Sequence, residues 1–396
     1  MDGPSPAMDP TSVDRLPGAA AQPGEAVLPV ERVAFPAEGP RSSLVRPVRS
    51  AVAPTGAVAG SFGRLAVPRE TSSGPAAGAG TRLSGGVTRG PVGRSGQAGR
   101  TVPAGTAAVM ERRLEVRGDP GPILGPHQHG GHDPTWQRAA DGTIWRTCRT
   151  PDGPGTLRVT RRGGQAWGPG AAWLLESLPS LLGADDDISG FEVRHEVLQG
   201  YGVPRIGRTG RVFEALVPAV LEQKVVGREA WRAWRWLLRR YGTPAPGPAP
   251  EGMRVMPEPE VWRQIPAWDW HRAGAEAVRA RTIATAAWHA DKLEAAADSA
   301  SLDRLLRALP GIGVWTSAEV RQRCMGDPDA VSVGDFHLAT IVGWALTGRK
   351  ADDAEMMRLL EPYRGHRHRA CLLVGLTGLR PPARGPRQSA RDYRSF

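Results

Sequence analysis

The sequence contains few cysteines and no long apolar run. Its three cysteines, Cys148, Cys324 and Cys371, lie far apart and form no CxxC pair. Three thiolates cannot complete the four-cysteine set of an iron–sulfur cluster, so we expect free thiols in a reducing cytoplasm. No apolar stretch approaches the roughly 20 residues that span a bilayer, and no signal-peptide core opens the chain. We therefore expect a bacterial-type cytoplasmic protein without a membrane partner.

Lysine is also scarce. Lys224, Lys292 and Lys350 are the only lysines among 51 basic residues, so the other 48 are arginine. A formal charge of +11 and a pI near 10.5 favour a polyanionic partner such as nucleic acid. Because GC-rich coding produces the same arginine bias, the charge alone is weak support for that partner.

Aromatic residues are nearly missing from the N-terminal part of the chain. Residues 1–106 hold only Phe35 and Phe62 amid Pro, Gly, Ala, Ser and Arg. Such a composition cannot bury enough apolar surface to offset the entropy of ordering, so we expect a disordered extension. Met110 offers a second interpretation, in which the chain starts there. The basic tail at 381–396 is expected to be flexible.

The remaining sequence predicts an α+β fold. The short alternating segments ERRLEV, GTIWRTCRT and GTLRVTRRG predict a small antiparallel sheet domain at 107–178. Residues 213–221 and 338–346 carry the i, i+3, i+4 apolar stripes of amphipathic helices, and 275–297 favours helix throughout. We therefore expect an all-helical domain at 179–380.

The stretch RALPGIGVWTSAEV, residues 307–320, predicts a tight turn between two helices. Pro310 ends the first helix, and Gly311 and Gly313 let the backbone bend without side chains over its N–H groups. A second helix is expected from about Val314, with its unpaired N–H groups at the same place. Such a turn could hold an anion such as a DNA phosphate. An ordinary helix–turn–helix corner without a ligand explains these residues equally well.

A second motif, VSVGDFHLA, follows the turn. It places Asp335 directly before an amphipathic helix. Aspartate is a favoured N-cap, which is the simplest interpretation of this residue. A capping carboxylate is also held ionised by backbone N–H groups, so it could stabilise positive charge on a deoxyribose.

The hairpin followed at this distance by VGDFHL resembles the helix–hairpin–helix DNA glycosylases, specifically the 3-methyladenine DNA glycosylase II branch. FEALVPAVLEQKVVGREA at 213–230 is similar to the helix pair that carries the residue inserted into the duplex. WDWHRAGAEAVRARTIATAA at 268–287 resembles the next helical segment, and 131–159 resembles the N-terminal sheet domain. The resemblance covers about residues 109–380.

This resemblance implies a monofunctional glycosylase that flips out alkylated bases, such as 3-methyladenine and 7-methylguanine, and excises them during base excision repair. Asp335 would be the catalytic carboxylate, and Trp315, Glu319 and Phe336 would line the substrate pocket. Trp315 stands where bifunctional members place a nucleophilic lysine, so no lyase activity is expected. A tryptophan that only packs between helices is the alternative.

The resemblance also implies a binding surface for damaged double-stranded DNA. Its expected residues come from the hairpin and from the helix pair: Gly311, Ile312, Gly313, Thr316, Gln223 and Lys224. The protein is expected to act as a monomer, associated with the nucleoid, without a cofactor; a monovalent cation could bridge the hairpin carbonyls to phosphate.

Several positions leave alternatives open. Glu319 stands where an aromatic residue is usual in alkylbase enzymes, and it could attract a cationic base or be solvated. Lys224 could fill the gap left by the flipped nucleotide or be solvated. The histidines of HQHGGHD, at 127–133, are too loosely spaced for a zinc site, so we expect no metal. A non-catalytic DNA-binding module, and a glycosylase for uracil or another neutral base, are the alternative functions.

Overall fold

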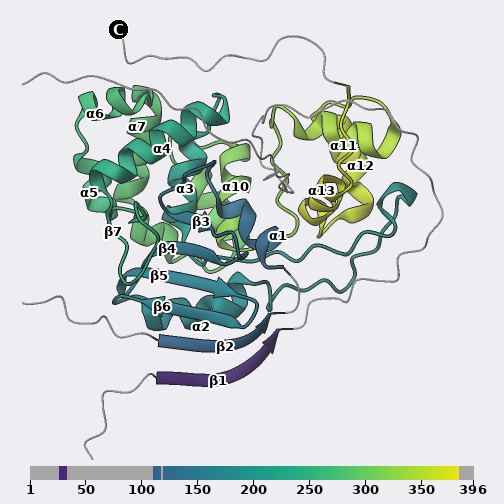
Figure 1. The fold of residues 1–396 in the computed structure, drawn as a ribbon. Coiled ribbons are helices and arrows are strands. Elements are labelled where there is room, and N and C mark those ends of the chain that lie inside the picture. Colours follow the sequence, from purple (N-terminus) through teal and green to yellow (C-terminus); the bar gives the residue numbers. More distant parts are fainter. Residues whose placement is uncertain (1–25, 34–109, 117–118, 383–396) are drawn as a thin grey trace, which may run out of the picture.

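The computed structural model describes residues 26–33, 110–116 and 119–382 (Figure 1). The expectations for 1–106 and 381–396 fall almost entirely outside these described residues. Within them, a β-sheet forms one layer, a large group of helices lies against it, and a second group of helices lies to one side (Figure 1). None of the described helices is both long enough and apolar enough to cross a membrane.

The sheet contains six strands in the order β1-β2-β6-β5-β4-β3. The predicted antiparallel pairing is confirmed for β2 through β6. Their alternating burial reflects one face packed against helix α2 (Ala171–Leu181). The bounds of the strands are Ala26–Val33 (β1), Met110–Val116 (β2), Trp136–Arg138 (β3), Ile144–Thr150 (β4), Gly153–Thr160 (β5) and Gly163–Trp167 (β6).

Strand β1 lies within the segment 1–106, outside the sheet domain expected at 107–178, and it pairs parallel to β2. The octapeptide AVLPVERV is rich in Val and Leu, which favour strands, but the average composition of a hundred residues conceals so short a segment.

Two glycines let α2 approach the sheet closely. A Cβ added at Gly155 would lie 2.5 Å from a methyl carbon of Leu174, and one at Gly164 would lie 2.5 Å from a methyl carbon of Leu178. Both leucines are fully buried. Close packing of this kind fixes the sheet to α2, which lies at the end of the sheet domain expected at 107–178.

Helix α3 (Val212–Leu221) forms the centre of the large helical group. Nine of its ten residues are buried, so the helix is buried on nearly all sides and not only along the predicted apolar stripe. The segment expected as one helix at 275–297 is instead two, because the backbone at His289 (φ −108°, ψ 11°) leaves the helical region. The surrounding elements are α4 (Gly227–Tyr241), β7 (Thr243–Pro244), β8 (Arg254–Val255), α5 (Pro259–Gln264), α6 (Ala267–Ala273), α7 (Ala277–Trp288), α8 (Ala290–Glu294), α9 (Ser299–Arg307) and α10 (Val314–Cys324).

The second helical group has its own apolar core. Leu338, Ile341 and Val342 of α11 pack with buried residues of α12 and α13, which confirms the stripe predicted at 338–346. The elements of this group are η2 (Glu196–Leu198), α11 (Leu338–Thr347), α12 (Asp353–Leu360), η3 (Glu361–Tyr363) and α13 (Arg367–Leu376), while α1 (Gly121–Leu124) and η1 (Gly125–His127) precede β3.

Candidate active site

The predicted hairpin joins α9 to α10. Gly311 has a φ of +87°, and a Cβ added there would lie 2.2 Å from Oγ1 of Thr282. Glycine is therefore required both by backbone conformation and by close packing. Gly313 is the N-cap of α10 in extended conformation, has nothing within 4 Å of an added Cβ, and receives no side-chain cap. The positive end of α10 is thus left available to an anion.

Gln223 connects this hairpin to the turn between α3 and α4. Its side-chain amide donates to the carbonyl of Gly311 and to Oγ1 of Thr316, both at 2.9 Å. The structure therefore brings together three of the expected DNA-binding residues, Gln223, Gly311 and Thr316. The side chains of Gln223 and Thr316 are hydrogen-bonded to each other, so this contact holds the turn to the hairpin. Thr316 and Ile312 are buried, at 2% and 6% exposed, so only the backbone of Ile312 is suited to contact a ligand.

Lys224 occupies the next position in this turn. Its backbone has a φ of +53°, a left-handed conformation that is uncommon outside glycine, and its side chain is exposed. The guanidinium of Arg279 donates to the carbonyl of Gln223 at 3.0 Å and thereby holds the turn in this shape. Strained backbone held by its surroundings is typical of functional sites.

Asp335 is half-buried in the loop before α11. Its Oδ1 accepts hydrogen bonds from the backbone N–H groups of His337 and Leu338, both at 2.9 Å. Its Oδ2 accepts from Nε1 of Trp315 at 3.3 Å. The expected capping role is therefore present, and it uses one oxygen of the carboxylate while the other faces the first turn of α10.

Phe336 and Trp315 flank this carboxylate with aromatic surface. Phe336 is 81% exposed and touches only the edge of the His337 ring, with the centroids 4.7 Å apart, among the described aromatic contacts. Trp315 is half-buried. The carboxylate is thus bonded to an indole, and an exposed phenyl group follows it directly in the chain.

Glu319 does not belong to that surface. It is fully buried, and its carboxylate accepts from Arg323 at 2.8 Å and from the hydroxyl of Ser332. The guanidinium of Arg323 also donates to the carbonyl of Pro126, which lies next to the sheet. We therefore assign Glu319 a positioning role, joining α10 to the loop before Asp335, in place of the expected contact with a base.

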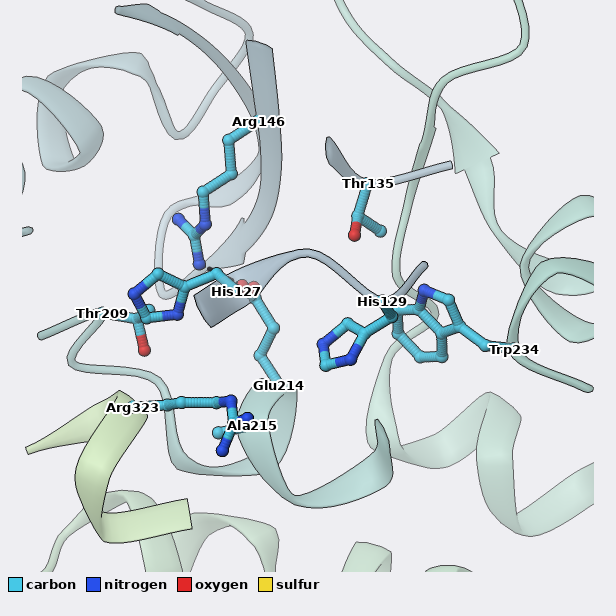
Figure 2. A pocket seen from close by; sticks show the side chains of 9 residues that line it. All are labelled: His127, His129, Thr135, Arg146, Thr209, Glu214, Ala215, Trp234 and Arg323. Carbon is cyan, nitrogen blue, oxygen red and sulfur yellow. Dashed lines mark hydrogen bonds and ion pairs between the residues drawn. The ribbon is translucent and has the colours of Figure 1, made fainter. Parts of the chain in front are cut away.

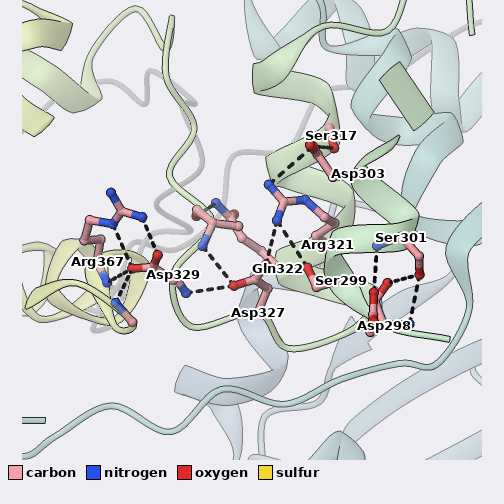
Figure 3. A network of polar contacts seen from close by, with 12 residues as sticks. Asp298, Ser299, Ser301, Asp303, Ser317, Arg321, Gln322, Asp327, Asp329 and Arg367 are labelled. Carbon is pink, nitrogen blue, oxygen red and sulfur yellow. Dashed lines mark hydrogen bonds and ion pairs between the residues drawn. The ribbon is translucent and has the colours of Figure 1, made fainter. Parts of the chain in front are cut away.

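A polar network braces the back of the hairpin (Figure 3). Arg321 of α10 donates to Asp327 at 2.7 Å and to Ser299 of α9 at 3.2 Å, and Ser317 donates to Asp303 at 2.6 Å. The network continues through Asp329, which pairs with Arg367 of α13, while Asp298 and Ser301 form a capping box at the start of α9. These contacts fix the hairpin relative to the helical group that carries Asp335.

A polar cavity of about 20 Å³ lies between the sheet and α3, and no motif in the sequence indicates it (Figure 2). Its wall includes His127, His129, Arg146, Glu214 and Arg323, whereas Asp335 does not line it. Burial, together with the charges of Arg146 and Arg323, lowers the pKa of His127 well below its usual value. A cavity of this size holds about one water molecule and cannot admit a nucleobase.

The histidine-rich loop contacts the α3–α4 turn instead of forming a metal site. Nδ1 of His129 lies 3.4 Å from Oε1 of Glu222, which also accepts from the indole N–H of Trp231 at 3.2 Å. Burial opposes ionisation of Glu222, but the hydrogen bond and charge of His129 lower its pKa overall. Asp133, fully buried, accepts from the indole of Trp234 at 3.0 Å. Loop and turn are thereby locked together.

Comparisons with known proteins place this geometry in context. No family model matches the chain. The chain is 34% identical over 167 residues to a Mycobacterium tuberculosis protein described as a probable bifunctional transcriptional activator/DNA repair enzyme AlkA; the match covers 41% of the chain and 32% of that protein. The chain thus spans about a third of the length of the curated relative it matches.

A solved structure shares the fold. A structure of MBOgg1 in complex with a low-affinity DNA ligand aligns with a TM-score of 0.50 at 14% identity, covering 69% of this chain and 96% of that one. A 3-methyladenine DNA glycosylase from Archaeoglobus fulgidus aligns with a TM-score of 0.49 at 15% identity, covering 61% and 89% of the two chains. In the present chain, the indole of Trp315 connects the helix that follows the hairpin to the carboxylate of Asp335.

Proposed function

We propose that the chain is a monofunctional DNA glycosylase that hydrolyses the N-glycosidic bond of alkylated purines in duplex DNA. The observation that carries the proposal is the position of Asp335, which is hydrogen-bonded to Trp315 in the first turn of the helix that the hairpin starts. This hydrogen bond connects α10, whose N-terminus is suited to bind a phosphate, to the carboxylate of Asp335, which is suited to stabilise positive charge on the sugar. The DNA repair function named for the mycobacterial relative agrees with this proposal.

Binding would begin at the hairpin. The exposed Gly313 and the uncapped N-terminus of α10 offer backbone N–H groups to a phosphate of the damaged strand. Extruding a nucleotide costs a few kcal/mol and is least costly where alkylation has weakened pairing. The exposed ammonium group of Lys224 lies on the turn that Gln223 ties to the hairpin, so its alkyl stem is placed to enter the space left in the duplex.

The flipped base would meet aromatic surface. Trp315 and the exposed Phe336 supply π-faces, which attract a positively charged methylated purine by roughly 0.5–2 kcal/mol. The cavity of about 20 Å³ between the sheet and α3 is not lined by these two residues, so the base would be received at the surface of Trp315 and Phe336 and not in that cavity.

Asp335 would then stabilise the sugar. Two backbone N–H groups at 2.9 Å hold one oxygen of its carboxylate, so the second oxygen can face the positive charge that develops on the deoxyribose as the base departs. A cationic methylated purine leaves as a neutral base and needs no general acid. Water then attacks the anomeric carbon, forming the new C–O bond and releasing a proton. Tryptophan at position 315 cannot form a Schiff base, so the abasic strand would remain uncut.

A panel of duplexes tests this function. Each carries one 3-methyladenine, 7-methylguanine, uracil or 8-oxoguanine, and free base and strand breaks are quantified after incubation with the protein. We expect release of the methylated purines, with strand breaks only after alkali treatment. Release of uracil alone would favour a glycosylase for neutral bases. Salt-sensitive binding without any released base would favour a DNA-binding module and contradict the proposal.

A further inference from the structure

Four arginines share one face of α4. Arg228, Arg232, Arg235 and Arg239 are spaced by four, three and four residues, which places them in line along a helix. We call them the α4 arginine stripe. Arg228 and Arg239 are exposed, and Arg235 is half-buried with its guanidinium donating to the carbonyl of Gly131 at 3.1 Å. The stripe spans 11 residues, or about 16 Å.

No acidic side chain interrupts the stripe. The one carboxylate of α4, Glu229, is buried on another face. Three members of the stripe form no ion pair with the residues that the structure describes: Arg228, Arg235 and Arg239. Other solvent-accessible arginines do form ion pairs, for example Arg138 with Asp119, Arg208 with Asp185 and Arg364 with Glu361.

The arginines of the stripe also repel one another. Burial lowers the pKa of Arg235, and the charges of Arg239 and Arg232 lower it further, while Asp133 opposes the shift. Like charges at a spacing of one helical turn destabilise a helix. A sequence that keeps four of them in line thus retains an arrangement that an external polyanion would stabilise.

The stripe begins beside the turn that contacts the hairpin. Arg228 follows Lys224 by four positions and lies in the first turn of α4. In the same turn as Lys224, the side-chain amide of Gln223 donates to the carbonyl of Gly311 in the hairpin. Basic groups therefore extend along α4 from the turn that is bonded to the hairpin.

We propose that the α4 arginine stripe binds the phosphate backbone of duplex DNA at a distance from the hairpin, so that it extends the footprint of the protein along the double helix. The proposal rests on the proposed function, because it takes DNA as the partner. Guanidinium groups pair with phosphate oxygens in a planar fork, which makes arginine well suited to this contact. The stripe contributes affinity and orientation but no base specificity.

Salt dependence of binding tests the proposal. The probe is an undamaged fluorescein-labelled duplex, and affinity is measured by anisotropy between about 50 and 200 mM NaCl. Each phosphate contact contributes about 0.9 to the slope of log affinity against log salt, so R228Q/R239Q should be shallower by about 1.8. R228K/R239K should keep most of the slope, because lysine retains the charge.

The matched control is R161Q/R162Q, which removes two exposed arginines from the turn between β5 and β6. We expect R161Q/R162Q to keep the wild-type slope. R161Q/R162Q and R228Q/R239Q should both keep the wild-type melting temperature. A slope in R228Q/R239Q equal to that of the wild type, or equal losses in the two variants, would overturn the proposal for the stripe. Excision of methylated bases by the wild-type protein would in that case still support the glycosylase function.

Discussion

The indole N–H of Trp315 donates to Oδ2 of Asp335 across 3.3 Å, and this contact joins α10 to the loop that precedes α11. It orients the carboxylate oxygen that does not cap the helix. In the proposed function the same indole would also offer its face to a base. Trp315 would then have two separable roles, which variants can distinguish.

Replacing Trp315 by Phe keeps an aromatic face and removes the N–H donor. We expect the single-turnover excision rate to fall by about 1 kcal/mol of activation free energy, or roughly fivefold, because one hydrogen bond is lost. Trp315→Ala should lose roughly a further 0.5–2 kcal/mol of cation–π attraction for a methylated purine. Equal rates in the two variants would show that the ring face does not contact the base.

Alanine substitution should destabilise the protein at one of the two hairpin glycines and leave its stability nearly unchanged at the other. Gly311→Ala places a Cβ at positive φ and 2.2 Å from Thr282, so we expect the free energy of unfolding to fall by about 1–3 kcal/mol. Gly313→Ala meets open space at an ordinary φ, so stability should change by less than about 0.5 kcal/mol. If a phosphate sits on Gly313, the second variant should bind DNA more weakly while remaining fully folded. Unchanged DNA affinity in Gly313→Ala would place the phosphate elsewhere.

The buried pair of Glu319 and Arg323 should govern stability. Glu319→Gln leaves the charge of Arg323 uncompensated in the interior, so we expect the free energy of unfolding to fall by about 3–5 kcal/mol in urea denaturation. Glu355→Gln removes the partner of the exposed Arg358 at the protein surface and should cost less than about 1 kcal/mol. If both variants were equally stable, the positioning role of Glu319 would be refuted.

His368 should make the protein sensitive to acid. Burial, together with the charge of Arg323, lowers its pKa from 6.5 to about 3 in the folded state. The unfolded chain therefore takes up a proton below about pH 6.5 that the folded chain does not, and stability falls as the pH drops from 6.5 toward 3. His368→Gln should lose less stability between pH 7 and pH 5 than the wild type, measured as the urea midpoint. His271→Gln, at an exposed helical position, is the control and should behave as the wild type does.

The sequence predicted the parts of the site that depend on neighbouring residues. Gly311, Gly313 and the capping bonds of Asp335 follow from local turn and cap chemistry, and they are found where expected. The apolar stripe at 338–346 likewise identified α11. Local patterns of this kind need no knowledge of the rest of the fold.

Long-range pairings could not be predicted in this way. Gln223 bonds Gly311 across 88 positions, and His129 meets Glu222 across 93, so neither contact leaves a periodic signal. Burial of Glu319 depends on Ser332 and on the loop of Pro126, which the chain brings there only on folding. For this reason the family resemblance places Glu319 at the substrate pocket, whereas in the structure its side chain is fully buried.

Single-turnover excision of 3-methyladenine by Asp335→Asn tests the central claim most directly. Asparagine caps helices about as well as aspartate, so the variant should fold and bind duplex DNA like the wild type. Without the negative charge beside the sugar, we expect excision to slow by about 10²–10³-fold. Excision at the wild-type rate by the folded variant would contradict the account.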